Sequence, residues 1–145
     1  MGRVGLLLMR ILKYAFVLSA FMFIYVAIKI PVQPHQPVSQ PVEIAITFAA
    51  LGCVLAGFVL PRILFRAAER TPQNNSDEAQ LKRWITKGII GIAYFEACIL
   101  IGLALHFLQG SVWLIDLLFG LGIVAELFWN PGTPPGAEKG DFLRN

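Results

Sequence analysis

Hydrophobic and polar residues are grouped in long blocks along this chain. Four apolar runs occupy residues 12–30, 42–61, 85–108 and 112–129, and short polar segments separate them. Each run has about the 20 residues that a helix needs to cross the hydrocarbon core of a bilayer. The pattern predicts an all-α fold, an integral membrane four-helix bundle made of two antiparallel transmembrane hairpins. We expect a single membrane domain over residues 1–145, with residues 131–145 as a flexible tail.

The charged residues favour a membrane protein and orient it. The chain is 57% hydrophobic and 14% charged, whereas soluble domains carry about 25% charged residues. Basic residues gather before the first run, between the second and third runs, and in the tail, and only Lys29 lies at the opposite end of a run. The positive-inside rule then places both termini in the cytoplasm. We predict a multi-pass protein of the bacterial inner membrane, N-in and C-in, that contacts membrane lipids and no nucleic acid.

Small residues recur at helical spacing in the second and third runs. Small side chains let helix backbones approach closely in lipid. Cys53 and Cys98 both lie within runs, where a thiol behaves as a small apolar group. We predict that the following residues pack helices together, within the bundle or against another subunit: Ala49, Gly52, Cys53, Ala56, Gly57, Gly88, Gly91 and Gly102.

Glu96 lies near the middle of the third run and is the main candidate for an ion-binding residue. An acidic residue at a membrane helix centre costs roughly 2.5 to 3.5 kcal/mol, so its presence calls for a reason. One interpretation is a protonatable site that binds a proton or cation, since burial disfavours the charged form. The other is a hydrogen-bonded carboxyl group that fixes helix register. Ser19 and Tyr25 are polar side chains of the first run that lie somewhat off its level.

A loop-and-helix pattern surrounds Glu96. It comprises the polar loop Glu69-Arg70-Thr71-Pro72-Gln73, the basic start Leu81-Lys82-Arg83, then Gly88, Gly91, Phe95-Glu96-Ala97 and Gly102. This order over residues 69–108 resembles the loop and second helix of the F-type ATP synthase c subunit. The resemblance implies that Glu96 holds the place of that family's ion-binding acid. The chain departs from the family in having four runs, and only Gly52 and Gly57 as glycines in the second. As a whole it resembles uncharacterised small four-helix membrane proteins of bacteria, which implies no specific activity.

The remaining polar residues support no enzyme. Asp116 and Glu126 flank the fourth run as secondary polar candidates, and we expect water or a basic side chain to reach Glu126. His35 and His106 do not face each other from two helices, so we predict no haem, no other cofactor and no metal. The three Trp residues, at run ends, are typical of an aromatic belt. No catalytic motif is present.

Two functions follow from these patterns. The first is a non-enzymatic small integral membrane subunit or accessory protein of a larger membrane assembly, an energy-transducing one among the candidates. Its partners would be other integral membrane subunits or further copies of the same chain. The alternative is a proton- or cation-handling membrane protein that uses Glu96 in a hairpin like that of the c subunit.

Overall fold

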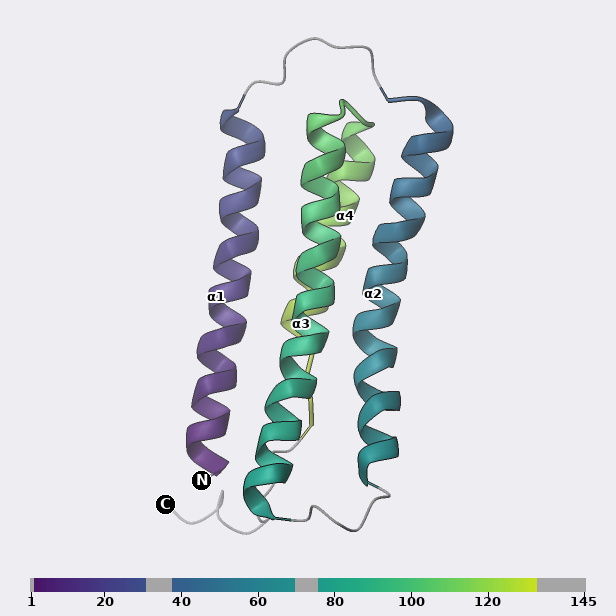
Figure 1. Ribbon diagram of the computed structural model, residues 1–145. Helices are drawn as coiled ribbons and strands as arrows, with labels where there is room; N and C mark the ends of the chain where they lie inside the picture. Colours follow the sequence, from purple (N-terminus) through teal and green to yellow (C-terminus); the bar gives the residue numbers. More distant parts are fainter. Residues whose placement is uncertain (1, 31–37, 70–75, 133–145) are drawn as a thin grey trace.

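The computed structural model describes residues 2–30, 38–69 and 76–132. That part of the chain forms four helices, α1 (Gly2–Lys29), α2 (Gln40–Glu69), α3 (Asp77–Phe107) and α4 (Val112–Phe128). No β-strand occurs among the described residues, so the predicted all-α class is confirmed. The helices run side by side along one long axis, as Figure 1 shows. Most of the predicted tail, residues 133–145, lies outside the described residues.

Three of the helices extend beyond the apolar runs that predicted them. α1 begins at Gly2 and not at residue 12, so Arg10 lies inside the helix and not ahead of it, and Lys13 lies about three turns from its start. α2 continues through Pro61 to Glu69. A hydrophobic run measures the part of a helix suited to an apolar medium. Arg, Lys, Glu and Ala are also good helix formers, so a helix can continue past that part.

Local signals fix both ends of α3. The Ser76 hydroxyl oxygen accepts a 3.3 Å hydrogen bond from the Ala79 backbone N–H, which makes Ser76 the N-cap that the sequence predicts. At the other end, the Gly110 N–H donates to the Leu105 carbonyl oxygen over 2.9 Å. Gln109 has φ 57°, the left-handed conformation common just after a helix end. The chain therefore reverses tightly between α3 and α4, which pack as an antiparallel hairpin.

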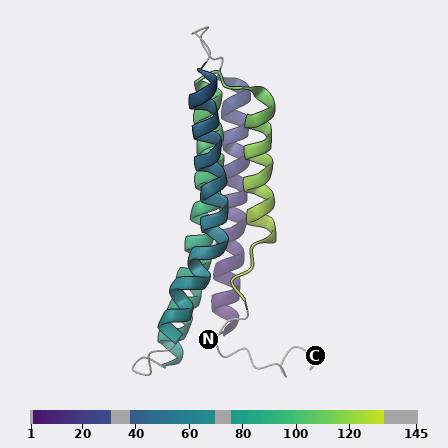
Figure 2. The ribbon, with the colours of Figure 1, turned by 90° about the vertical axis from the view of Figure 1, so that its right-hand side faces the viewer.

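α3 is the central helix and packs against the three others. α1 and α2 lie on opposite sides of the α3–α4 hairpin in both views (Figures 1 and 2). The expected first hairpin therefore differs from the structure, because α3 and α4 separate α1 from α2. The two ends of the bundle are named by the segments that they hold. The N-terminal end holds the start of α1 and the end of α4, and the turn end holds residues 108–111.

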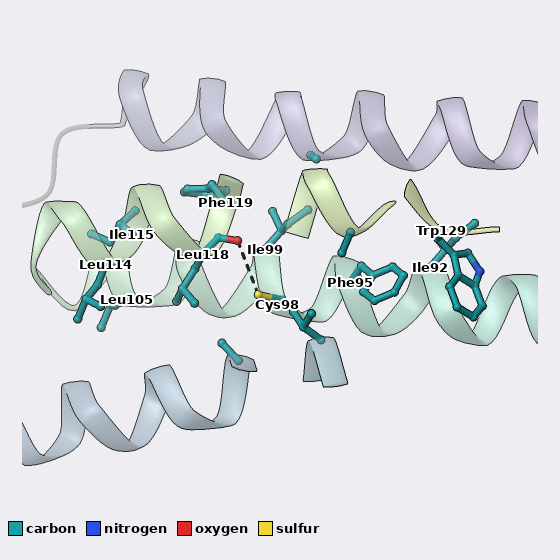
Figure 3. Close-up of a cluster of buried hydrophobic side chains, with 14 of the residues drawn as sticks. Ile92, Phe95, Cys98, Ile99, Leu105, Leu114, Ile115, Leu118, Phe119 and Trp129 are labelled. Atoms are coloured by element: carbon teal, nitrogen blue, oxygen red, sulfur yellow. Dashed lines mark hydrogen bonds between the residues drawn. The ribbon is translucent and has the colours of Figure 1, made fainter. Parts of the chain in front are cut away.

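The best-packed core lies along the α3–α4 interface, where apolar side chains from both helices interleave (Figure 3). Ile99, Leu105 and Leu118 are fully buried there. The outward surfaces of the bundle are also apolar, with exposed large side chains such as Leu18, Phe21, Phe48, Leu55 and Phe128. α1, α2 and α3 are long and apolar enough to cross a membrane. α4, with 17 residues, is shorter.

Candidate functional site

Glu96 lies in the middle of α3, and its side chain is only 8% exposed. Oε1 of Glu96 accepts a 2.6 Å hydrogen bond from the Ser19 hydroxyl group of α1. Ser19 is therefore level with Glu96, closer than the sequence indicated, because α1 and α3 run parallel with matching heights. Tyr25, the other polar side chain considered, is exposed on the outside of α1. The carboxyl group of Glu96 thus joins two helices.

Glu126 of α4 is fully buried, with 0% of its side chain exposed. Of the two neighbours expected for it, water does not reach it, and the basic side chain that attracts it is Lys13 and not Arg62, Arg66 or Lys87. α1 and α3 extend past its level toward the N-terminal end, and Trp129 and Pro131 follow α4 back along α3. The Glu126 carboxyl group lies close to that of Glu96, near enough for the charge of Glu96 to act on it. Two acidic side chains from adjacent helices therefore meet inside the bundle.

Three of the four oxygens in this carboxyl pair have no hydrogen-bond partner in the described structure. They are Oε2 of Glu96 and both Oε atoms of Glu126. The Glu96 and Glu126 carboxyl groups lie within hydrogen-bonding reach of each other, and a proton on either one would supply the missing donor. Buried carboxylates without partners are costly. The two carboxyl groups therefore lack the donor, such as a shared proton, that would satisfy their oxygens.

Lys13 supplies the positive charge next to the pair. Its ammonium group donates hydrogen bonds to the carbonyl oxygens of Leu127 and of Trp129, the latter over 3.3 Å. These carbonyls belong to the end of α4, where the helix dipole favours a cation. Lys13 and Glu126 also attract each other through charge. Ser19, Glu96, Glu126 and Lys13, here called the polar cluster, thus connect α1, α3 and α4.

The small residues predicted to pack helices fall into two groups. Gly57, Gly88, Gly91 and Gly102 are buried, and a Cβ atom at Gly57 would lie 2.6 Å from the Phe95 ring. Cys53 and Ala56 are half-buried. Ala49 and Gly52 face outward, and nothing lies within 4 Å of a Cβ atom built at Gly52. The small face of α2 is therefore only partly used inside the bundle.

Two of the three tryptophans lie in the interior and not in a surface belt. Trp84 and Trp129 are buried, whereas Trp113 is exposed. The Trp84 indole N–H donates a 2.9 Å hydrogen bond to the Gly132 carbonyl oxygen, and the Trp129 ring packs on Gly91. Both rings are buried because the chain after α4 folds back over α3. The belt interpretation was wrong for these two residues.

The other candidates do not join the polar cluster. Asp116 is exposed on α4, and His106 lies near the turn end with its ring against Phe107. His35 lies outside the described residues. Within the described ranges no three His, Cys, Asp or Glu side chains gather in a way that could hold a metal ion.

The pairing of Glu96 with Glu126 and the place of Lys13 were not predicted from the sequence. One signal for the pairing was available, because the two glutamates lie at similar sequence separations from the turn at Gln109–Gly110. Residues equidistant from a hairpin turn lie at the same depth. Lys13 offered no such signal, since its place depends on the height at which α1 packs against the end of α4.

No family model, curated protein sequence or solved structure matches this chain. The resemblance to the c subunit therefore remains a prediction from the residues around Glu96.

Proposed function

We propose that this chain is an integral membrane protein whose Glu96–Glu126 pair binds and releases a proton. The membrane assignment is supported by three helices of sufficient length and by the apolar outer surfaces. The proposed membrane is the bacterial inner membrane, with both termini in the cytoplasm. All four helices then form the transmembrane bundle, with α4 as its shortest member.

Topology is tested with single cysteines in a background in which Cys53 and Cys98 are replaced by alanine. Ser39→Cys is placed beside the start of α2, at the turn end. Asn75→Cys is placed in the segment between α2 and α3. A membrane-impermeant maleimide should label the first variant from outside intact cells and the second only after the cells are opened. Labelling in the reverse order contradicts the topology.

The observation that carries the proton-binding proposal is the set of three unpartnered carboxylate oxygens in the pair. Two neighbouring buried carboxyl groups cannot both ionise without a large cost, and sharing one proton removes it. One proton on the pair leaves a single negative charge, which the ammonium group of Lys13 balances. The polar cluster then carries no net charge, which is the state favoured in the apolar interior of a membrane. A proton is favoured over a metal ion because only two acidic side chains converge here.

Dicyclohexylcarbodiimide tests the proposal, since it modifies protonated carboxyl groups in apolar surroundings. Mass spectrometry of the treated protein should locate the modification on Glu96 or Glu126, and the reaction should slow as the pH rises and the shared proton is lost. The Glu96→Gln, Glu126→Gln double variant should not react inside the membrane. The exposed Asp116 should show no comparable modification. Absence of modification at both glutamates over the whole pH range contradicts a shared proton.

The single substitution Glu96→Gln separates a proton-binding role from a structural one. Gln keeps the side-chain volume and can still accept the Ser19 hydrogen bond, but it cannot ionise. A proton-handling protein should fold and assemble normally with this change and lose its proton uptake. Unchanged proton uptake in the variant, measured with a pH indicator in vesicles, favours a structural carboxyl group.

A second candidate function is an accessory subunit of a larger membrane assembly, with no enzymatic activity of its own. The observation in its favour is the outward face of α2, where Ala49 and Gly52 leave room for another helix to approach. Gly52→Leu should then release a stoichiometric partner, or a further copy of the chain, during extraction in mild detergent. Leu18→Ala, at an exposed position on α1, is the control outside this face. A protein that extracts as a monomer before any substitution contradicts this function.

A further inference from the structure

A cavity of about 400 Å³ opens at the N-terminal end of the bundle, between α1, α3 and the chain that follows α4. Its wall includes the charged side chains of Arg10 and Lys13 and the polar Asn130. Arg10 and Asn130 are exposed at its surface. The cavity is wide enough for several waters, and its polar groups can hold them. Water therefore has a route into the bundle from this end.

Lys13 stands between this cavity and the carboxyl pair. Its side chain lines the cavity, as does Leu127, the residue after Glu126. Glu126 itself is fully buried and does not line the cavity. The Lys13 ammonium group is held by the carbonyl oxygens of Leu127 and Trp129, at the level of the α4 end. A movement of this one long side chain would expose the Glu126 carboxyl group to the water.

Toward the turn end, the α3–α4 interface offers no such cavity among the described residues. From Glu96 to the turn end, the α3–α4 interface is filled by Ile99, Leu105 and Leu118, each with no exposed surface (Figure 3). The distance from Glu96 to Leu105 along α3 is roughly 14 Å at the rise of an α-helix. Within it the one polar side chain of the interface core is Cys98, whose thiol donates to the Leu118 carbonyl oxygen over 3.6 Å. A dry apolar segment of this length offers a proton no carrier.

We infer that the carboxyl pair exchanges its proton with water only at the N-terminal end of the bundle, through the cavity, and that Lys13 gates this exchange. The inference rests on the proposed proton-binding function and adds its route and its gate. On release, the proton passes from the pair to a water in the cavity and leaves two carboxylates beside the Lys13 ammonium group. Binding is the reverse transfer. The titratable side chain that interacts with Glu126 besides Glu96 is Lys13. Cys98 of α3 and Cys53 of α2 interact with each other.

One-sided exchange distinguishes a proton-binding protein from a proton conduit. A conduit needs access from both faces, whereas a site open to one face reports the pH of that face or passes its proton on only when a partner opens the other side. In the proposed topology, the open face is the cytoplasmic one. Binding would then follow cytoplasmic pH.

The test uses the full-length protein in sealed vesicles of both orientations and a charged, membrane-impermeant carbodiimide. Exposed Glu78 should react only when the reagent meets the N-terminal end, and exposed Asp116 only when it meets the turn end. These two residues verify the sidedness of each preparation. The inference expects Glu126 or Glu96 to react only from the N-terminal end, and an amide cross-link from Glu126 to Lys13 counts as reaction. Reaction of the pair from the turn end, or from neither end, overturns the inference.

Lys13 variants test the gate. Lys13→Met keeps the length of the side chain and removes its charge and hydrogen bonds, so the impermeant reagent should modify the pair at least tenfold faster. Lys13→Arg keeps the charge and should react at close to the original rate. Equal rates in all three proteins overturn the gating role. Dicyclohexylcarbodiimide, which crosses the membrane, tests the proposed proton-binding function separately from the proposed route. If it too fails to modify the pair, the proposed function is wrong, whereas its success with two-sided impermeant labelling contradicts the route alone.

Discussion

The Ser19 hydroxyl group and the Glu96 carboxyl group meet across the α1–α3 interface at 2.6 Å. The bond lies about two-thirds of the way along two parallel helices. Among the described residues, it is the side-chain hydrogen bond that joins α1 to α3 at this depth. It orients the Glu96 carboxyl group, because Oε1 is taken by Ser19 and Oε2 is left without a partner. The direction in which Glu96 can share a proton is thereby fixed.

Ser19→Ala removes this bond and should lower the free energy of unfolding by about 0.6 to 2 kcal/mol, the value of a hydrogen bond inside a membrane. Ser19→Thr keeps a hydroxyl group and should lose less. Thr47→Ala is the control, because the Thr47 hydroxyl group bonds to the Glu43 carbonyl oxygen of its own helix. Equilibrium unfolding in mixed detergent micelles gives the three values. Equal losses for Ser19→Ala and Thr47→Ala would show that the contact with Glu96 adds no stability.

The two glutamates should respond differently to replacement by leucine. No protein donor reaches Glu126 in the described structure, and its proposed bond is the proton shared with Glu96. Glu126→Leu removes that shared proton but leaves no neutral hydroxyl group unpaired, so it should destabilise less than Glu96→Leu. Lys13 keeps its bonds to the two carbonyl groups. Glu96→Leu leaves the Ser19 hydroxyl group unpaired and should destabilise. The same unfolding measurement compares them, and a larger destabilisation by Glu126→Leu than by Glu96→Leu would contradict the described surroundings of Glu126.

Much of the fold was predictable from the sequence, but the site was not. Hydrophobic runs locate the helices, and Ser76 and Gly110 mark ends of α3 and of its turn. The depth of Glu126 depends on how far the neighbouring helices extend beyond α4 and on the course of the chain after Trp129. Neither is a property of the run that contains Glu126. The interior positions of Trp84 and Trp129 were missed for the same reason.

Helix packing around Gly91 is close enough to exclude a methyl group. A Cβ atom there would lie 2.5 Å from the Trp129 ring, which is itself packed against Phe58 and Phe95. Gly91→Ala should therefore destabilise by about 1 to 3 kcal/mol through overpacking. Gly120→Ala is the matched control on an open position of α4 and should be neutral or slightly stabilising. Thermal unfolding followed by circular dichroism should rank the two, and an unaffected Gly91→Ala would contradict the position of Trp129.

Glu43 secures the start of α4 from the neighbouring helix. Its carboxylate accepts a hydrogen bond from the Ser111 backbone N–H, and the Ser111 side chain makes no capping bond of its own. Glu43→Ala should raise amide hydrogen exchange several-fold in the first turn of α4 and leave the centre of α3 unchanged. Glu78→Ala removes an exposed i,i+4 ion pair with Lys82 and should leave α4 unaffected. Unchanged exchange at residues 112–114 in Glu43→Ala would contradict this cap.

The difference in length between α3 and α4 has a consequence for the surrounding lipid. α3 has 31 residues and α4 has 17, which correspond to roughly 46 Å and 25 Å at the rise of an α-helix. The hydrocarbon core of a bilayer is about 30 Å thick. Beside α4, the apolar surface of the protein would be shorter than the hydrocarbon core of the bilayer. Beside α3 and its long neighbours, it would not be. The bilayer should therefore thin locally beside α4. The cost of this thinning favours a thinner membrane, or a neighbouring protein with an equally short helix on that side.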